Sequence, residues 1–240
     1  ELDSSTWHAQ VRGQYEAVVN CVSSAGGGLD GYRKSYVDGQ CSILEWAKSQ
    51  TIRTYVYTSS TSVYPQDGGV TVDESADTSA APPTGQVLLQ SEAMLADAEQ
   101  MDRWFVLRLA GIYGQGRHFL LNQLREANGE IPGSGEYAMN MIHLEDIVSA
   151  ISAALSGEAA SGIYNIVDDA PVTKSEVLTW LAEAMGLPVP AFDPDKVSER
   201  LKRRGGRMPH RYVSNAKARA QLGWQPKYPS YRDGYAGWLS

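Results

Sequence analysis

The sequence predicts an α/β fold, a doubly wound parallel sheet with a small C-terminal lobe. Three short runs rich in β-branched and aromatic residues predict strands, and two longer runs with apolar residues at helical spacing separate them. This alternation implies parallel strands joined by right-handed helical crossovers. The last third of the chain has shorter strands. We therefore divide the chain into a core over residues 1–135 and a mixed C-terminal region over residues 136–240.

The predicted core elements follow one another along the chain. They are a buried strand at 17–22, a helix from 32 to 49, a strand at 54–59, a helix at 86–99 and a buried strand at 104–109. The first helix places its apolar residues on one face, at steps of four, three and three: Val37, Cys41, Leu44 and Ala47. These apolar stripes predict helices that cover the sheet.

The C-terminal region carries recognisable helix boundaries. Thr173 and Glu176 form a capping box at the start of one helix, and Gly186 ends that helix before a proline. Ser214 opens a further helix that ends at Gly223. Two more segments complete the region: a strand at 163–167, and a mobile connection rich in Pro, Gly and charge at 187–209.

Composition and charge exclude several classes of protein. With 42% hydrophobic residues, 240 residues can bury one substantial core. The 28 acidic residues exceed the 21 basic ones and give a net charge of −7, which argues against nucleic acid as a partner. No apolar run reaches the roughly 20 residues needed to span a bilayer, so we expect no membrane partner. No Cys or His spacing suggests a metal site.

Cysteine usage points to a reducing compartment. Cys21 lies in an apolar strand and Cys41 on a helical face, a pattern typical of reduced interior thiols and not of a disulfide framework. The polar opening of the sequence is no signal peptide. These features predict a cytoplasmic protein.

One local basic run leaves two interpretations open. It consists of Lys202-Arg203-Arg204, followed by Arg207 and Arg211. A run of this kind is compatible with a solvated loop and equally with a pocket for substrate phosphates.

A Gly-x-Gly-x-x-Gly pattern, at Gly26, Gly28 and Gly31, follows the first strand. We reject it as a dinucleotide fingerprint, because the fingerprint needs an acidic residue about 20 residues later, at the end of the next strand. This chain has Arg53 near that distance, and its next strand ends in the hydroxyls Thr58-Ser59-Ser60. Such hydroxyls suit a reaction centre, so we expect the glycines to form a flexible loop after a middle strand.

Several blocks of the sequence resemble the NAD-dependent epimerase/dehydratase family, the extended short-chain dehydrogenases. One is the hydroxyl cluster that runs into Val63-Tyr64, and another is Pro83-Thr84-Gly85 followed by Glu92. Four more blocks follow the order and spacing of the family, at 36–40, 107–114, 141–146 and 164–167. The resemblance covers nearly the whole chain and implies a Rossmann-like core with a C-terminal substrate lobe.

The resemblance also implies a cofactor, NAD or NADP, and a small-molecule substrate such as a nucleotide sugar. It places the cofactor at Cys21, Val22, Ser23, Ser24, Tyr36, Ser59, Ala110 and Gly111, and the substrate at Tyr113, Arg117, His118 and Arg207. It implies a homodimer formed by the helices at 32–49 and 86–99. The first Gly-rich turn of the family, its first helix and its second strand, about 50 residues in all, would lie upstream of Glu1, and so would the acidic or basic residue that decides between NAD and NADP.

The proton chemistry of the family is altered in this sequence. The family uses a tyrosine and, four residues later, a lysine, and this chain has Thr84 and Leu88 in those places. Ser60, which corresponds to the hydroxyl that hydrogen-bonds the reacting oxygen, is retained. An aliphatic alcohol is a much weaker acid than a phenol, whose free pKa is about 10. Ordinary epimerase or reductase turnover should therefore fall by about 100- to 10,000-fold.

Other side chains are candidates for the missing group. Tyr64 lies four residues after Ser60, although it could instead pack at the strand-to-loop turn, and Tyr113, His118 and His143 are further candidates. A histidine such as His143, at a strand end next to a helix start, is often a hydrogen-bonded structural residue.

Two functional classes stay open on the sequence alone. The first is an enzyme with altered or weak redox chemistry, in which Ser60, Thr84 and Tyr64 are the catalytic candidates. The second is a non-catalytic protein that senses a dinucleotide or regulates through it. The loss of both the tyrosine and the lysine, with the surrounding blocks retained, motivates the second class.

Overall fold

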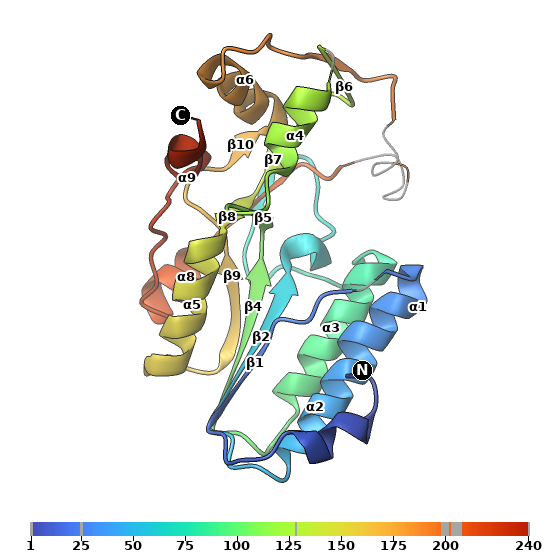
Figure 1. The fold of residues 1–240 in the computed structure, drawn as a ribbon, viewed down its shortest axis with the longest axis vertical. Coiled ribbons are helices and arrows are strands. Elements are labelled where there is room, and N and C mark those ends of the chain that lie inside the picture. The colour runs from blue at the N-terminus through green and yellow to red at the C-terminus, as the bar shows by residue number, and fades with distance from the viewer. Residues whose placement is uncertain (1, 25, 128, 198–201, 203–207, 240) are drawn as a thin grey trace.

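The structure, a computed structural model, describes residues 2–24, 26–127, 129–197, 202 and 208–239. Its centre is a parallel sheet with the strand order β1-β2-β4-β9. The strands are β1 (Ala17–Asn20), β2 (Thr54–Ser60), β4 (Arg103–Leu109) and β9 (Gly162–Ile166). Helices cover both faces of this sheet (Figure 1). The predicted doubly wound α/β fold is confirmed.

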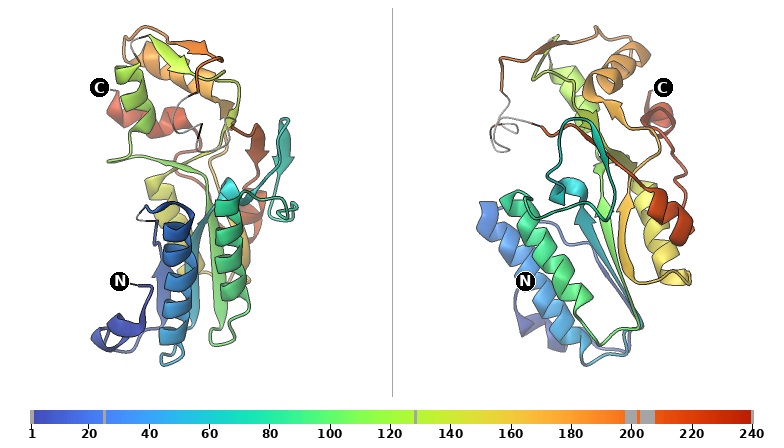
Figure 2. Two further views of the ribbon diagram at one scale, coloured as in Figure 1. Left: turned by 90° about the vertical axis from the view of Figure 1, so that its right-hand side faces the viewer. Right: turned by 180° about the vertical axis from the view of Figure 1, so that it is seen from behind.

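One helical layer consists of two long helical rods that run side by side in the same direction, opposite to the strands (Figure 2). The first rod joins α1 (Gly28–Arg33), the π-helical turn η2 (Lys34–Asp38) and α2 (Gly39–Ala47), and the second is α3 (Pro83–Ala96). Each rod begins about one turn earlier than the sequence predicts. Their apolar side chains pack on Tyr55 and Tyr57 of β2.

The π turn changes which residues of the first rod face the sheet. The Gly39 N–H donates to the carbonyl of Lys34, five residues back, so the turn holds one extra residue. Gln40 consequently faces inward and is fully buried, whereas Cys41 is exposed. Cys21, which follows the last residue of β1, is exposed too. The prediction of interior thiols is therefore wrong for both cysteines.

Strand β1 is shorter and less buried than predicted. Val19 is 41% exposed and Val18 is half-buried. The reason is topological, because among the described residues no strand pairs with the outer edge of β1. The strand is held from one side only, in register with β2, where Asn20 lies opposite Tyr57.

The second face of the sheet is covered by α5 (Leu144–Ser156) and α8 (Ala216–Gln221) (Figure 1). Val56, Phe105 and Leu107 point toward this side and form the main apolar core with Ile147 and Ala150. The predicted boundaries of α8 are close to those observed. The Ser214 hydroxyl accepts the N–H of Ala216, and Gly223, with φ of +66°, follows the end of the helix.

A smaller lobe sits over the carboxyl ends of the strands (Figure 1). Its helices are α4 (Phe119–Glu126), α6 (Lys174–Ala184) and α9 (Tyr231–Tyr235). The capping box at the start of α6 is confirmed, because Thr173 Oγ1 accepts the N–H of Glu176 and the Glu176 carboxylate accepts the N–H of Thr173.

Short strand pairs build the rest of the lobe and join it to the core. They are β5 (Gly111–Tyr113) with β8 (Met141–His143), β7 (Ala138–Met139) with β10 (Val172–Thr173), β6 (Glu130–Pro132) with β11 (Ala191–Asp193), and β3 (Val70–Val72) with β12 (Arg211–Val213). Three short 3₁₀ helices also occur in the described residues: η1 (Ser5–Gln10), η3 (Thr61–Val63) and η4 (Ala236–Trp238). The division of the chain at residue 135 stays a prediction. Over the described ranges, no helix combines the length and the apolar character needed to cross a membrane.

Candidate functional site

The candidate site lies where β1, β2 and β4 end beneath the lobe. Hydroxyls tie these strand ends together, since Thr58 Oγ1 donates to the carbonyl of Asn20 and Thr61 Oγ1 donates to the carbonyl of Leu109. Ser60, half-buried at the end of β2, caps η3 by accepting the N–H of Ser62 at 3.1 Å. This bond uses a lone pair of the Ser60 oxygen, so its hydroxyl hydrogen can be donated to a bound molecule.

Helix α3 begins against the same turn. A Cβ added to Gly85 would lie 3.3 Å from Cα of Val63, which shows how closely the two elements approach. Thr84 stands in the first turn of α3 and is half-buried. Leu88, one turn further on, is 1% exposed and belongs to the main apolar core. The place of the family's lysine is thus part of the packed interior.

The loop after β1 closes the third side of the site. Asn20 shapes it, because Asn20 Oδ1 accepts the N–H of Val22, and the phenol of Tyr36 accepts the N–H of Ser24. Cys21 and Ser23 are exposed. The loop therefore has a defined shape and leaves two of its predicted cofactor residues, Cys21 and Ser23, at its surface.

The glycines that follow this loop have structural reasons for being glycine. Gly26, Gly27 and Gly28 have φ between +63° and +106°, a region that L-residues avoid. A Cβ on Gly31 would lie 1.7 Å from the carbonyl oxygen of Gly26. The tight turn that leads into α1 therefore requires glycine at the three positions of the Gly-x-Gly-x-x-Gly pattern.

The residues present fit the nicotinamide half of a dinucleotide. Half-buried hydroxyls at Ser60 and Thr84 flank small residues at the end of β4, where Ala110 is buried and Gly111 is exposed. A side chain at Gly111 would crowd the carbonyl oxygen of Asn140, 3.1 Å from its Cβ. The set offers hydroxyls and backbone groups, which suit a carboxamide and ribose hydroxyls, and small residues that let a flat ring approach. Ser60, Thr84 and the loop after β1 would hold such a ring, and a bound nicotinamide supplies hydride chemistry.

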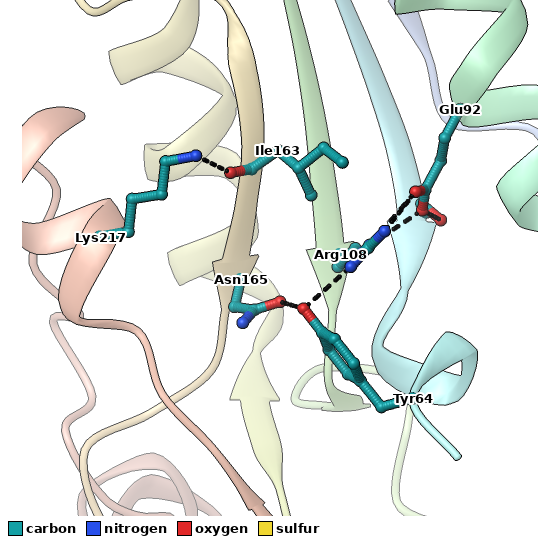
Figure 3. A network of polar contacts seen from close by, with 7 residues as sticks. Tyr64, Glu92, Arg108, Ile163, Asn165 and Lys217 are labelled. Carbon is teal, nitrogen blue, oxygen red and sulfur yellow. Dashed lines mark hydrogen bonds and ion pairs between the residues drawn. The ribbon is translucent and has the colours of Figure 1, made fainter. Parts of the chain in front are cut away.

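A buried polar network lies directly behind the Ser60 turn (Figure 3). The Ser59 hydroxyl donates to Glu92 Oε1 at 2.6 Å. Arg108 donates to both oxygens of Glu92, closest at 2.6 Å, and to the phenol of Tyr64 at 3.0 Å. Tyr64 in turn donates to Asn165 Oδ1 at 2.8 Å. Ser59 is a predicted cofactor residue, but its hydroxyl donates to Glu92 in the protein interior.

This network favours the structural interpretation of Tyr64. Its ring is 1% exposed, and its phenol already serves as donor to Asn165 and acceptor from Arg108. Burial raises the pKa of Tyr64, and the nearby charge and hydrogen bond of Arg108 only partly oppose that effect. A neutral, buried and fully bonded phenol is a poor proton acceptor for a substrate. As a catalytic candidate Tyr64 is therefore disfavoured.

Tyr113 and His143 belong to the interior of the lobe. Tyr113 is 3% exposed, stacks on Tyr235 and donates to the carbonyl of Ser230 at 3.3 Å. Burial raises its pKa far above the ordinary phenol value. His143 is 4% exposed, accepts the N–H of Glu145 as the cap of α5, and packs its ring against the tilted ring of Tyr228. Both residues have structural roles in this arrangement.

The remaining predicted substrate residues lie at the edge of the lobe. Arg117 is exposed in the loop before α4. The ring of His118 is half-buried and lies 4.9 Å from the ring of Trp238. Arg207, with Arg203 and Arg204 of the basic run, lies outside the described residues.

The sequence reasoning missed two groups. Glu92 was recognised only as part of a motif, and Arg108 only as part of the block at 107–114. An arginine within an apolar strand nevertheless signals a buried partner. The sequence reasoning also did not single out Asp168 or Tyr235. Asp168 is 4% exposed, and burial raises its pKa to about 8. Asp168 Oδ1 and the Tyr235 phenol are both buried without a hydrogen-bond partner in the part of the chain that the structure describes.

Taken together, the parallel sheet, the hydroxyl-lined carboxyl ends and the open loop after β1 define an α/β protein of the dinucleotide-binding class. A comparison with protein families is more specific. Residues 2–167 match the model of the NAD dependent epimerase/dehydratase family. The chain belongs to this family, and the predicted family and cofactor class, NAD or NADP, are confirmed at that level.

Individual relatives share less than a third of their residues with this chain. Protein YeeZ of Escherichia coli is 29% identical over 196 residues, covering 81% of this chain and 65% of YeeZ. A 3-diazoavenalumate denitrifying reductase of a Streptomyces species is 29% identical over 213 residues, covering 82% of this chain and 68% of the reductase. The chain thus spans about two thirds of the length of these relatives.

Solved structures show the same fold. MoeE5, solved in complex with UDP-glucose and NAD, aligns with a TM-score of 0.82 and 22% identity over 100% of this chain and 82% of MoeE5. At this identity the likeness shows the fold alone.

Proposed function

We propose that this protein binds a nicotinamide dinucleotide and transfers hydride to or from a small molecule by an altered chemistry that does not use a Tyr-Lys pair. One observation carries the proposal: the carboxyl ends of the strands keep the Ser60 hydroxyl and small residues that suit a nicotinamide, while the lysine position is Leu88, packed into the core. The groups that suit the ring are kept, and the Tyr-Lys pair is absent.

The burial and pKa values of the tyrosines near the site narrow the class of reaction further. The phenols of Tyr64 and Tyr113 are buried, with raised pKa values, so neither replaces the missing base. Reduction consumes a proton together with the hydride, and an electron-poor acceptor that takes this proton from water needs no acid–base residue of the protein. Reduction of this kind of acceptor is therefore favoured over sugar epimerisation, which requires a proton to leave and return. The reductase named among the relatives is consistent with this direction.

The finer predictions from the sequence belong to the same proposal. A nucleotide-sugar-like substrate, contacted by Arg117 and His118, rests on the resemblance of the sequence to the family. A homodimer would pair the exposed sides of α2 and α3, and sedimentation showing a monomer at micromolar concentration would remove it. A cytoplasmic location still rests on the sequence.

The experiment that tests the proposal is calorimetric titration with NADH, NADPH and reduced nicotinamide mononucleotide. Reduced nicotinamide mononucleotide carries only the half of the dinucleotide that the described site fits. It should bind to the wild-type protein, and Thr84→Trp should abolish this binding. Asp97→Asn, an exposed change at the far end of α3, is the matched control. Failure of all three ligands to bind would refute the proposal.

A non-catalytic dinucleotide sensor is the second candidate, and the packing of Leu88 favours it. The place of the family's lysine holds an apolar side chain with 1% exposure, which can neither lower a pKa nor bind a ribose. Tight binding of NADH without hydride transfer to any acceptor in a broad panel would select the sensor. Oxidation of NADH in the presence of one acceptor, lost in Ser60→Ala, would select the enzyme.

A further inference from the structure

The turn that carries Ser60 is anchored at both ends by one ion pair. Before the turn, Ser59 donates to Glu92, and after it, the Tyr64 phenol accepts from Arg108. Glu92 and Arg108 are joined by two N–H groups of the guanidinium, with the closest contact at 2.6 Å. The backbone from Ser59 to Tyr64 and the two side-chain arms therefore form a closed ring through the ion pair (Figure 3).

We infer that Glu92 and Arg108 are positioning residues that fix the Ser60 turn, and hence the Ser60 hydroxyl, at the mouth of the candidate site. The inference rests on the proposed function for its catalytic meaning, because Ser60 is the hydroxyl that the proposal assigns to the reacting molecule. The ring itself is a property of the protein without a ligand. It can therefore be tested separately.

The polar groups of this ring are well satisfied. Tyr64 is both donor and acceptor, and Asn165 Nδ2 donates to the carbonyl of Ser214 while its Oδ1 accepts from Tyr64. Burial alone would lower the pKa of Arg108, but its hydrogen bonds to Glu92 and the charge of Glu92 outweigh burial and raise it. The guanidinium is therefore held in its charged, five-donor form.

Stability alone gives a weak reason for such a pair. Arg108 and Glu92 are only 3% and 4% exposed, and removing two charges from water costs about as much as their attraction returns. Apolar residues of similar volume often serve a core equally well. What an apolar pair cannot supply is direction, because only the planar guanidinium and the carboxylate fix Ser59 and Tyr64 at defined angles. The two fixed points lie on either side of Ser60.

Neighbouring residues provide matched controls. Tyr57 lies two residues before Ser59 on β2, and Ser91 precedes Glu92 on α3. Both are fully buried, and in the described structure neither is hydrogen-bonded to Glu92 or Arg108. Tyr64→Phe can thus be compared with Tyr57→Phe, and Ser59→Ala with Ser91→Ala. Each comparison deletes the same oxygen from the same kind of buried position.

The test is amide hydrogen exchange of the ligand-free protein, read by mass spectrometry. Tyr64→Phe and Ser59→Ala should each speed exchange in the segment 60–64 by about fivefold, the effect of losing one hydrogen bond worth about 1 kcal/mol. Peptides from α5 should not change at the early time points, which report local opening and not global unfolding. The control variants should leave segment 60–64 at the wild-type rate.

The double variant Ser59→Ala/Tyr64→Phe sharpens the test. Releasing one end already frees the turn, so the double variant should speed exchange by less than the product of the two single effects. Three outcomes would overturn the inference. Multiplicative effects would mean that the two bonds act independently, an unchanged segment 60–64 would mean that they do not hold the turn, and equal acceleration in α5 would mean that the destabilisation is global.

A catalytic readout follows if the proposed function holds. With NADH and a reducible acceptor, Tyr64→Phe should lower kcat several-fold and leave the affinity for NADH unchanged, and in a Ser60→Ala background it should have no further effect. A kcat that falls equally in both backgrounds would contradict positioning through Ser60. Failure of NADH to bind at all would refute the proposed function and leave the exchange result standing.

Discussion

Two buried polar clusters in this protein differ in how well their groups are paired. In the ring around Glu92 and Arg108, the ion pair bonds both flanks of the Ser60 turn. In the second cluster, which lies around Tyr113, Asp168 and Tyr235 each bury an oxygen with no partner among the described residues. In the first cluster, hydrogen bonds offset the free-energy cost of removing the polar groups from water, and in the second cluster they do not. Substitutions in the two clusters should therefore have opposite effects on stability.

The largest effect is expected for Glu92→Leu. This change leaves the Arg108 guanidinium buried and uncompensated, which should lower the free energy of unfolding by about 3–5 kcal/mol. The double variant Glu92→Leu/Arg108→Met should recover most of the loss, because no isolated charge remains. Urea unfolding followed by circular dichroism measures both. A double variant no more stable than Glu92→Leu would show that the ion pair is itself stabilising.

The next largest effect tests the altered site. Restoring the family pair with Thr84→Tyr and Leu88→Lys should destabilise the protein by about 2–4 kcal/mol, because Leu88 is 1% exposed and a buried ammonium there lacks a partner. Thr84→Tyr alone should cost less, since Thr84 is half-buried. Thermal unfolding with and without NADH measures the effect. Wild-type stability of the double variant would show that the lysine reaches solvent or a partner, and that the pocket is easily converted.

The sequence predicted the parallel sheet, both long helices and the α6 capping box correctly because these features depend on local pattern. The prediction that Cys41 is buried was wrong because a single π turn changes which residues of the helix face inward. The spacing of apolar residues in the sequence does not reveal such a turn. The prediction for β1 was wrong because exposure of that strand depends on which neighbours complete the sheet. Tyr64 was left open for a similar reason: its partners, Arg108 and Asn165, are 44 and 101 residues away.

Asp168 in the poorly paired cluster predicts a pH dependence. Burial raises its folded pKa from 3.8 to about 8, so between these values the folded state binds a proton that the unfolded state has released. The contribution of this group to stability is complete below pH 3.8 and is lost as the pH rises toward 8. Asp168→Asn removes the titration and should stabilise the protein by about 1–3 kcal/mol at pH 8, with little change at pH 4.

Unfolding by urea at pH 5, 7 and 9 measures this effect for both proteins. The difference between Asp168→Asn and wild type should grow with pH over this range. Asp97→Asn is the control, because Asp97 is exposed at the end of α3 and its charge is not among the causes that raise the pKa of Asp168. A constant difference across the three pH values would mean that Asp168 is ionised throughout and has a partner.

The smallest effect compares two buried tyrosines directly. Tyr235→Phe removes a phenol that has no partner among the described residues, so it should be neutral or stabilising by up to about 1 kcal/mol. Tyr64→Phe removes a phenol with two partners, leaves Asn165 Oδ1 without its donor, and should cost about 1–2 kcal/mol. Because both rings are 1% exposed, lost apolar contact is nearly equal in the pair and cancels in the difference. Equal losses from the two variants, measured by urea unfolding at pH 7, would mean that Tyr235 has a bound water or another acceptor, and the contrast between the clusters would then lie in solvation and not in pairing.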